Sequence, residues 1–159
     1  TPLMNGRLTG AFRGLTLAHT PAHLYRAAIE GTACGLRWIV ELLREEGLPV
    51  QRLTASGGLP HHNPLLVQIY ADVLGEPIEI PRATQGPALG AAILGALAAG
   101  PEVTGFTTTA AAIRGMTAAR EGSPVTRTVR PNPEAHAAYA EVYAAYRRLA
   151  AEEQNRLEA

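Results

Sequence analysis

The stretch LTASGGLPHHNP, residues 53–64, combines the signals that decide the fold. Leu53 to Ser56 is typical of a short strand, and Gly57–Gly58 follow it directly as turn residues. Asn63–Pro64 then begins a helix, because Asn is a favoured N-cap and Pro fits the first helical position. A strand, a glycine turn and a helix in this order predict one unit of an α/β fold.

The same alternation continues on both sides of this stretch and predicts helices packed on a largely parallel sheet. Thr20–Pro21 and Asn132–Pro133 mark helix starts, and Gly47 and Gly75 mark helix ends. The helix that opens at Gly86 is apolar on nearly all sides, so we expect it to be buried. The remaining predicted elements are strands at 11–17 and 78–80, helices at 20–46, 64–74, 86–97 and 107–117, an extended passage at 125–129, and a last long helix from 133.

The composition is that of an ordinary globular domain. The chain has 159 residues, 47% of them hydrophobic, which is enough for one domain with a real core. Fourteen basic residues balance fourteen acidic ones, so no positive excess favours nucleic acid or an anionic membrane surface as a partner. No apolar run is long enough to span a bilayer.

The chain start and the single cysteine bear on location. Thr1 to Gly6 lacks the features of a signal peptide, and the absence of an initial Met is expected of a piece of a longer protein. Cys34 alone cannot build a disulfide framework, which favours the cytoplasm. It has no cationic neighbour, so a buried structural thiol is favoured over a nucleophile. Gly31 and Gly35 are costly inside a helix, so another backbone is expected to pass close to them.

The glycine pair is the main candidate site. Gly57 and Gly58 lie at the carboxyl end of a predicted strand and precede a helix, where open α/β sheets bind ligands. Missing side chains let a flat base or a sugar lie against backbone, and a helix start offers free N–H groups. The alternative is that the two glycines only make the turn, because a glycine pair is a weak motif.

Other candidates favour structural roles. His61–His62 could hold a metal, but no third ligand lies at helical spacing, so a solvated loop pair is expected. Asp72 lies inside a helix and is expected at the surface or in helix packing. Tyr139, Tyr143 and Tyr146 have helical spacing and form a packing stripe. Neither the P-loop pattern nor the dinucleotide glycine fingerprint occurs.

Two segments resemble one known family. Gly10-x-Phe12-x-Gly14-Leu15, followed after seven residues by His23-Leu24-x-x-Ala27-Ala28-Ile29-Glu30, fits the C-terminal signature of the FGGY carbohydrate kinases. Residues 55–75 resemble the adenosine-binding segment of that family, and their Gly-Gly-Leu-Pro-x-x-Asn-Pro-Leu form resembles its ribulokinase members. Residues 88–92 and the helix from Asn132 to Tyr146 are similar to the family segments that follow.

The resemblance implies an actin-like, ribonuclease-H-like ATPase fold, a three-layer α/β/α domain in a two-domain kinase. Residues 1–100 would form the core of the C-terminal domain on the nucleotide side, and residues 101–159 its C-terminal helical extension. Such kinases transfer the γ-phosphoryl group of ATP with Mg2+ to a sugar hydroxyl, here L-ribulose, in the cleft between the domains. Gly57, Gly58 and Asn63 would contact the adenosine, with Asn63 serving partly as a helix cap.

The resemblance implies that the catalytic residues of the kinase lie outside this chain. No Asp here matches the catalytic motif of the family, so the catalytic residue, the sugar site and most of the Mg2+ site are expected upstream. The partner is then the protein's own N-terminal kinase domain, and the small-residue face from Ala27 to Gly35 is expected to meet that domain or a second subunit of a homodimer. The alternatives are a kinase for ribitol, D-ribulose, xylulose or another polyol, and a non-catalytic actin-like module for binding or assembly.

Overall fold

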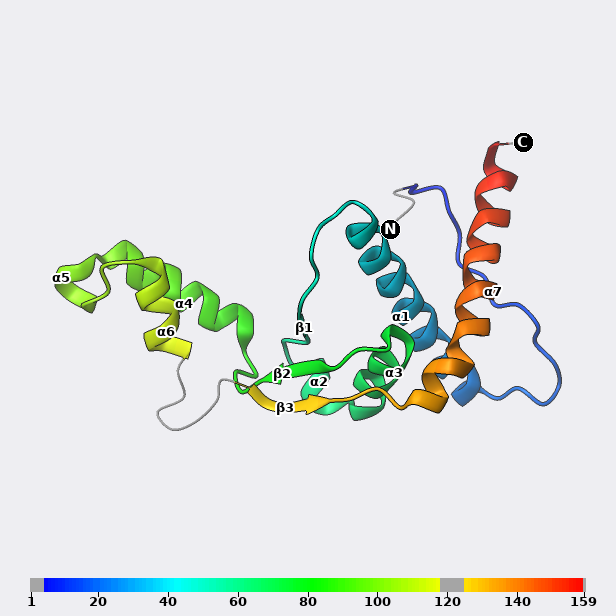
Figure 1. Cartoon of the computed structure of the whole chain (residues 1–159), viewed down its shortest axis with the longest axis horizontal. Helices are drawn as coiled ribbons and strands as arrows, with labels where there is room; N and C mark the ends of the chain where they lie inside the picture. Colours follow the sequence, from blue (N-terminus) through cyan, green and yellow to red (C-terminus); the bar gives the residue numbers. More distant parts are fainter. Residues whose placement is uncertain (1–4, 118–124, 159) are drawn as a thin grey trace. The chain divides into compact units, whose positions relative to one another are not determined.

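The computed structural model describes residues 5–117 and 125–158 and divides the chain into two compact units. Unit 1 comprises Thr1–Gln51, Gln68–Pro77 and Arg130–Ala159, and unit 2 comprises Arg52–Val67 and Ile78–Val129. The proposed division near residue 100 stays a prediction. The elements in chain order (Figure 1) are α1 Pro21–Glu45, β1 Leu53–Thr54, α2 Leu59–His62, α3 Pro64–Leu74, β2 Ile78–Pro81, α4 Gly86–Ala99, α5 Pro101–Thr104, α6 Thr109–Thr117, β3 Val125–Val129 and α7 Pro133–Glu158.

In unit 1, α1 packs against α7. The start of each helix and the end of α1 lie where the sequence predicts. The Thr20 backbone N–H donates to Nδ1 of His23 at 3.0 Å, which satisfies a donor at the start of α1. Gly47 follows the end of α1 with φ of 77°, a conformation that favours glycine. The buried hydrophobic residues of these helices are Ile29, Ala33, Cys34 and Val40 of α1 and Tyr139 and Tyr143 of α7.

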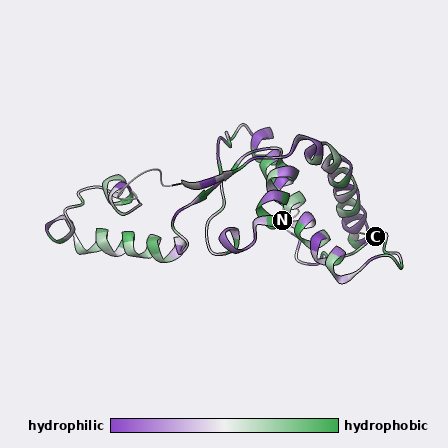
Figure 2. Ribbon diagram, turned by 90° about the horizontal axis from the view of Figure 1, so that it is seen from below, coloured by the Kyte–Doolittle hydropathy of each residue, from purple (hydrophilic) through white to green (hydrophobic). Residues whose placement is uncertain are grey.

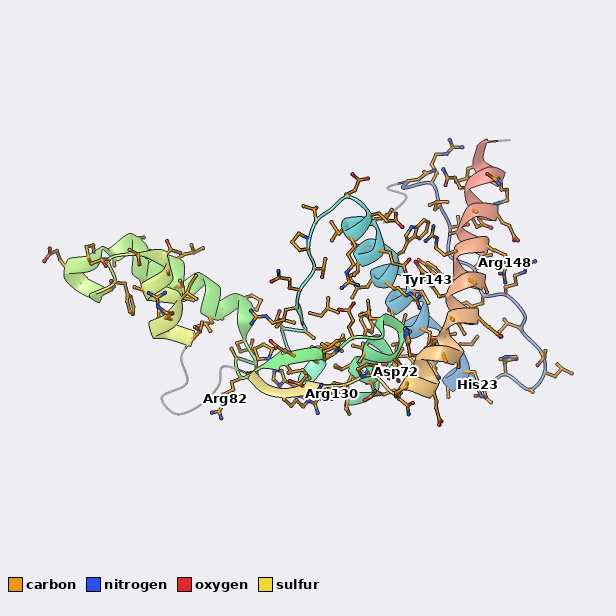
Figure 3. The ribbon with its side chains drawn as sticks, viewed as in Figure 1. His23, Asp72, Arg82, Arg130, Tyr143 and Arg148 are labelled. Carbon is orange, nitrogen blue, oxygen red and sulfur yellow. The ribbon has the colours of Figure 1, made fainter. Side chains whose placement is uncertain are left out.

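The tyrosines of α7 are packing residues, as predicted. Tyr139 donates through its hydroxyl to Glu30 Oε1 at 2.8 Å, and the Tyr143 hydroxyl donates to Glu41 (Figure 3). Arg37 Nε also donates to Glu41, at 2.9 Å. Each buried phenol thus gains an acidic partner on α1, so burial of Tyr139 and Tyr143 leaves their hydroxyls satisfied.

The Glu41–Tyr143 contact is electrostatically well defined. Partial burial raises the pKa of the Tyr143 hydroxyl, and the hydrogen bond to Glu41 raises it further. Burial also works to raise the pKa of the Glu41 carboxyl, but hydrogen bonds from Tyr143 and Arg37 outweigh it and lower that pKa. The pair is therefore a neutral phenol donating to a carboxylate at neutral pH.

Two arginines stack on the aromatic rings of this interface. The Arg37 guanidinium lies 4.2 Å from the Tyr143 ring centroid, and that of Arg147 lies 4.1 Å from the Trp38 centroid. The Trp38 and Tyr146 rings pack edge to face at 6.5 Å. The backbone expected close to Gly31 and Gly35 is not found among the described residues. A Cβ at Gly35 would lie 3.2 Å from the Tyr146 hydroxyl, and a Cβ at Gly31 would meet nothing within 4 Å.

Asp72 links α3 to the start of α7. Its side chain is only 7% exposed, and Oδ1 accepts from Gln68 Nε2 at 2.8 Å and from the Asn132 backbone N–H at 2.7 Å (Figure 3). The Asp72 carbonyl accepts from Nδ1 of His136 at 2.8 Å. The helix-packing role predicted for Asp72 is confirmed, and its partners explain why a carboxylate can be buried there.

The sheet lies in unit 2 and has the order β1-β2-β3. β1 pairs with β2 in parallel, with Leu53 beside Ile78, whereas β3 pairs with β2 antiparallel, with Arg127 beside Ile80 (Figure 1). The expectation of a largely parallel sheet is therefore wrong for β3. Strand direction depends on how a distant segment returns to the sheet, and residues 118–124 before β3 lie outside the described part.

Two further expectations are wrong. Residues 11–17 form no strand: Gly14 has φ of 78°, and the His19 backbone N–H donates to the Thr16 carbonyl in a turn. A strand also needs a partner for its backbone, and apolar composition cannot supply one. α4 is hydrophobic over most of its length (Figure 2), but Leu94 is 68% exposed and, of the α4 residues, only Ile93 is buried. α5 and α6 are its main neighbours in unit 2, too few to cover a helix that is apolar all round.

No single described helix is both long and apolar enough to cross a bilayer. α4 and the segment Pro101–Thr117 meet the criteria of length and composition together, but they are bent by 114°.

Gly75 is expected to be far less tolerant of alanine than Gly47. Both have positive φ (72° and 77°), so Ala adds strain of about 1 kcal/mol or somewhat more at either position. A Cβ at Gly75 would also lie 2.5 Å from Cε1 of His136, which is held by Asp72, whereas a Cβ at Gly47 meets nothing within 4 Å. In urea unfolding we expect the free energy of unfolding to fall by about 1–3 kcal/mol more in Gly75→Ala than in Gly47→Ala. Equal losses would show that the His136 ring moves freely.

Candidate functional site

The candidate site lies in unit 2, at the carboxyl ends of β1 and β2. These strands are parallel, so both chains leave the sheet at the same edge. The Ala55 backbone N–H donates to the Glu79 carbonyl at 2.9 Å, which extends the pairing by one residue. Gly86, the first residue of α4, lies beside the loop after β1: a Cβ there would be 3.8 Å from Ser56 Cβ and 4.0 Å from Gly57 N.

The two glycines differ in whether their backbone conformation requires glycine. Gly57 has φ of 91°, so its conformation alone calls for glycine. This agrees with the alternative that the glycine serves to make the turn. Gly58 has φ of −72° and ψ of −37°, which any residue adopts. A Cβ at Gly58 would lie at an ordinary 3.8 Å from His62 Cδ2. The fold of the described residues therefore does not require glycine at Gly58, where a missing side chain leaves room over the backbone.

Asn63 caps α3. Its Oδ1 accepts the Leu66 backbone N–H at 3.0 Å, and its carbonyl accepts that of Val67 at 3.4 Å. The predicted helix start at Asn63–Pro64 is confirmed, and the cap satisfies one of the free donors of the first turn. The ligand contact expected of Asn63 stays a prediction.

The segment between Gly58 and Asn63 is the short helix α2, which the sequence analysis treats as a loop. Its two histidines differ: His62 is exposed, but Nε2 of His61 is buried and has no hydrogen-bond partner among the described residues. The solvated pair expected at His61–His62 is therefore wrong for His61. Within residues 5–117 and 125–158, no three His, Cys, Asp or Glu side chains gather as a metal-binding group.

Arg127 contacts this segment, although no sequence motif identifies it. Nη2 of Arg127, on β3, donates to the carbonyl of Pro60, in α2, at 3.0 Å. The local sequence does contain a signal, because Pro64 stands four residues after Pro60 and has no N–H to serve that carbonyl. The donor itself is 67 residues away, so only the structure identifies it.

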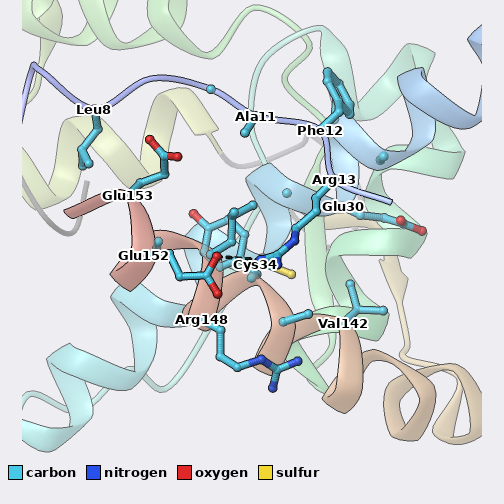
Figure 4. A pocket seen from close by; sticks show the side chains of 18 of the residues that line it. Leu8, Ala11, Phe12, Arg13, Glu30, Cys34, Val142, Arg148, Glu152 and Glu153 are labelled. Atoms are coloured by element: carbon cyan, nitrogen blue, oxygen red, sulfur yellow. Dashed lines mark hydrogen bonds and ion pairs between the residues drawn. The ribbon is translucent and has the colours of Figure 1, made fainter. Parts of the chain in front are cut away.

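A separate cavity of about 970 Å³ lies in unit 1 (Figure 4). Residues 8–13 pass over it, and Arg13 Nη1 forms an ion pair with Glu152 at 2.6 Å. Cys34 lines it but is only 1% exposed, and burial raises the pKa of its thiol to about 11. The thiol is therefore protonated at neutral pH, and the prediction of a buried structural cysteine is confirmed. The other lining side chains include Phe12, Trp38, Val142, Tyr146 and Arg148.

Chemically, the sheet edge is suited to binding. It presents the backbone of Gly57 and Gly58 and the Asn63 amide, groups that hydrogen-bond a ligand or lie flat against it. The described residues 55–63 include no carboxylate that could serve as a general base, and their two histidines differ in exposure. The sequence-predicted residues Gly57, Gly58 and Asn63 thus fall on one continuous turn, fixed at the sheet edge.

A family model covers most of the chain. The model of the C-terminal domain of the FGGY family of carbohydrate kinases matches residues 1–99. The match includes β1, β2 and the Gly57–Asn63 turn.

Curated relatives extend the similarity beyond residue 99. The chain is 42% identical to a ribulokinase of Bacillus licheniformis over 147 residues, which is 92% of this chain and 26% of that protein. It is 44% identical to a ribulokinase of Mycolicibacterium smegmatis over 144 residues, 91% of this chain and 24% of that protein. The chain therefore spans about a quarter of the length of these relatives.

Solved structures agree on the fold. A xylulose kinase of Rhodospirillum rubrum aligns with a TM-score of 0.71 and 27% identity, over 95% of this chain and 28% of that one. A structure described as a xyloylose kinase, from Brucella ovis, aligns with a TM-score of 0.70 and 29% identity, over 90% of this chain and 27% of that one. The domain match, the relatives and the fold together show that this chain belongs to the FGGY family of carbohydrate kinases, within its C-terminal domain.

Proposed function

We propose that the protein containing this chain is an ATP-dependent kinase that phosphorylates L-ribulose to L-ribulose 5-phosphate. The observation that carries the proposal is the identity of 42% with a ribulokinase over 92% of this chain. In the reaction, the substrate hydroxyl attacks the γ-phosphorus of ATP and loses its proton, and the bond from the γ-phosphorus to the β,γ-bridging oxygen breaks to release ADP.

In this proposal the chain supplies the nucleotide side of the active site. The adenosine of ATP lies against Gly57 and Gly58, where the absence of side chains, with nothing within 4 Å of a Cβ at Gly57, supports close approach of a flat ring to backbone. Asn63, which caps α3 through Oδ1, contacts the same nucleoside through its amide. Phosphoryl transfer depends mainly on positioning and charge stabilisation, so a rigid nucleotide turn contributes directly to the rate.

The remaining parts of the active site belong elsewhere in the protein. Mg2+ would neutralise charge on the phosphates, but the described residues offer no cluster of three ligands, so we assign most of its site to the remainder of the polypeptide. The catalytic base and the sugar site belong there too, in the N-terminal domain and the cleft between domains. Closure of the two domains would exclude water from ATP. We place the enzyme in the cytoplasm, and a second copy of the same protein, in a homodimer, is its further proposed partner.

A second substrate has support of its own. Two of the aligned structures are described as kinases of xylulose, at TM-scores of 0.71 and 0.70. D-xylulose, D-ribulose and ribitol are therefore the competing substrates for the same chemistry. A non-catalytic assembly module is disfavoured, because the relatives and the aligned structures carry the names of kinases.

The substrate is tested by ADP release from the full-length protein with L-ribulose, D-ribulose, ribitol, D-xylulose and glycerol. We expect kcat/KM for L-ribulose to exceed that for each other compound by at least about tenfold, a difference of about 1.4 kcal/mol in transition-state binding. The 159-residue chain alone should give no turnover with any of them. Preference for another compound would retain the kinase and replace its substrate, whereas no turnover with any of them would revive the assembly module.

Gly58→Ala tests nucleotide contact without disturbing the free protein. Because φ at Gly58 is −72° and a Cβ there would lie 3.8 Å from its nearest neighbour, the free energy of unfolding should stay within about 1 kcal/mol of wild type. Alanine should stabilise the backbone slightly. In the full-length enzyme, the methyl group should raise the KM for ATP by about tenfold and leave the KM for the sugar unchanged. Gly95→Ala, in α4 with nothing within 4 Å, is the matched control. An unchanged KM for ATP in Gly58→Ala would remove Gly58 from the site.

Asn63→Ser separates the cap from the ligand contact. Serine caps helices about as well as asparagine, so stability should stay within about 0.5 kcal/mol of wild type. The lost amide should raise the KM for ATP about fivefold, as expected for one hydrogen bond. Asn63→Ala should show the same change in KM together with a stability loss of about 1 kcal/mol. If the serine variant has a wild-type KM, Asn63 is a helix cap only.

A further inference from the structure

The Pro60 carbonyl cannot find its donor within α2. In a helix, this carbonyl would accept the N–H of residue 64, but that residue is a proline. The backbone also leaves the helical conformation at Asn63, with φ of −127° and ψ of 82°. Pro60 is buried, so water is a poor substitute, and an unsatisfied carbonyl there would destabilise the turn.

Arg127 supplies the missing donor from a strand. Its Nη2 lies 3.0 Å from the Pro60 carbonyl, and a charged donor makes such a bond stronger than a neutral one. Arg127 stands opposite Ile80 in the β2–β3 ladder, and Ile80 is fully buried. The pairing with Ile80 therefore sets the place of Arg127 in the sheet, next to a register shift between Ile80 and Pro81.

The turn that carries the candidate site is thus fixed at three points in unit 2. At its start, the Ala55 N–H donates to the Glu79 carbonyl, and at its end Asn63 caps α3. Arg127 holds the middle. Between these points lie Gly57 and Gly58, whose missing side chains provide no packing to hold the backbone. Local bonds of α2 also hold this segment, because the His61 and His62 N–H groups donate to the Gly58 carbonyl at 3.0 and 3.2 Å. The Pro60 contact is the hydrogen bond that ties α2 to β3.

We propose that Arg127 is a positioning residue for nucleotide binding. It holds the Pro60 carbonyl and thereby fixes the spacing of Gly58 and Asn63 before the nucleotide arrives. A preorganised turn binds more tightly, because it loses less conformational entropy on binding. Arg127 acts through Pro60 and not by contact with the nucleotide. This inference rests on the proposed function, since it assigns a device to the same site.

The test compares full-length wild type with Arg127→Met, which keeps the long apolar stem and removes every donor. Dissociation constants for ATP and for adenosine are measured by calorimetry, and amide exchange is followed over residues 57–63. Arg127→Lys restores one donor. Arg52→Met is the matched control, because Arg52 lies directly before β1 in the same unit and its replacement removes the same charge, which is paired with Glu79 at 3.6 Å.

We expect Arg127→Met to raise the dissociation constants of ATP and of adenosine equally, by about tenfold, and to speed amide exchange over residues 57–63. Arg127→Lys should recover part of the loss, the control should bind as wild type, and kcat and the KM for the sugar should change less than about twofold. A loss confined to ATP would mean that Arg127 acts through its charge on the phosphates, which overturns positioning. Wild-type affinity in Arg127→Met also overturns it and leaves the proposed function intact. A wild-type protein that binds neither ligand overturns both.

Discussion

The parallel pairing of β1 with β2 is the constraint on which the candidate site depends. Because Leu53 lies beside Ile78, the two strands end together, and the loops that follow them meet where Gly86 lies beside Ser56 and Gly57. β2 also pairs with β3 on its other side, which sets the position of Arg127. One four-residue strand thus aligns both the turn and its restraint. The glycines can be exposed to a ligand because hydrogen bonds elsewhere hold their backbone.

Unit 1 is stabilised by a different kind of interaction. α1 and α7 meet through tyrosines that donate to glutamates, with arginines stacked on the aromatic rings. These contacts combine apolar burial with satisfied polar groups, and they tolerate the small residues of α1 that bring the two helices close. Asp72 then ties α3 to the first residues of α7 through Gln68 and Asn132.

Local signals in the sequence predicted most of the elements. Thr20–Pro21, Asn63–Pro64 and Gly47 mark helix ends correctly, because capping depends only on neighbouring residues. The strand at 11–17 is wrong because strands depend on partners that a local pattern does not contain. The exposure of α4 has a similar cause: an apolar surface indicates what a helix could bury but not which neighbours cover it.

The candidate site shows the same division. The glycine pair and Asn63 could be identified from sequence, since strand, turn and cap are contiguous there. The sequence could not show that the backbone requires glycine at Gly57 but not at Gly58, because this depends on backbone angles and on the space above each residue. The contact of Arg127 with Pro60 joins residues 67 apart, and no periodicity reports such a pair.

The α1–α7 interface has a consequence for synthesis on the ribosome. α7 follows every other described element in the chain, yet its Tyr143 bonds Glu41, 102 residues earlier. While the chain emerges, the buried side of α1 must therefore wait until α7 has left the exit tunnel. At elongation rates of about 5–20 residues per second, this interval lasts on the order of several seconds. During that time the α1 surface that Tyr139 and Tyr143 will cover stays exposed to solvent, which makes the nascent chain a natural client for chaperones that bind exposed helices.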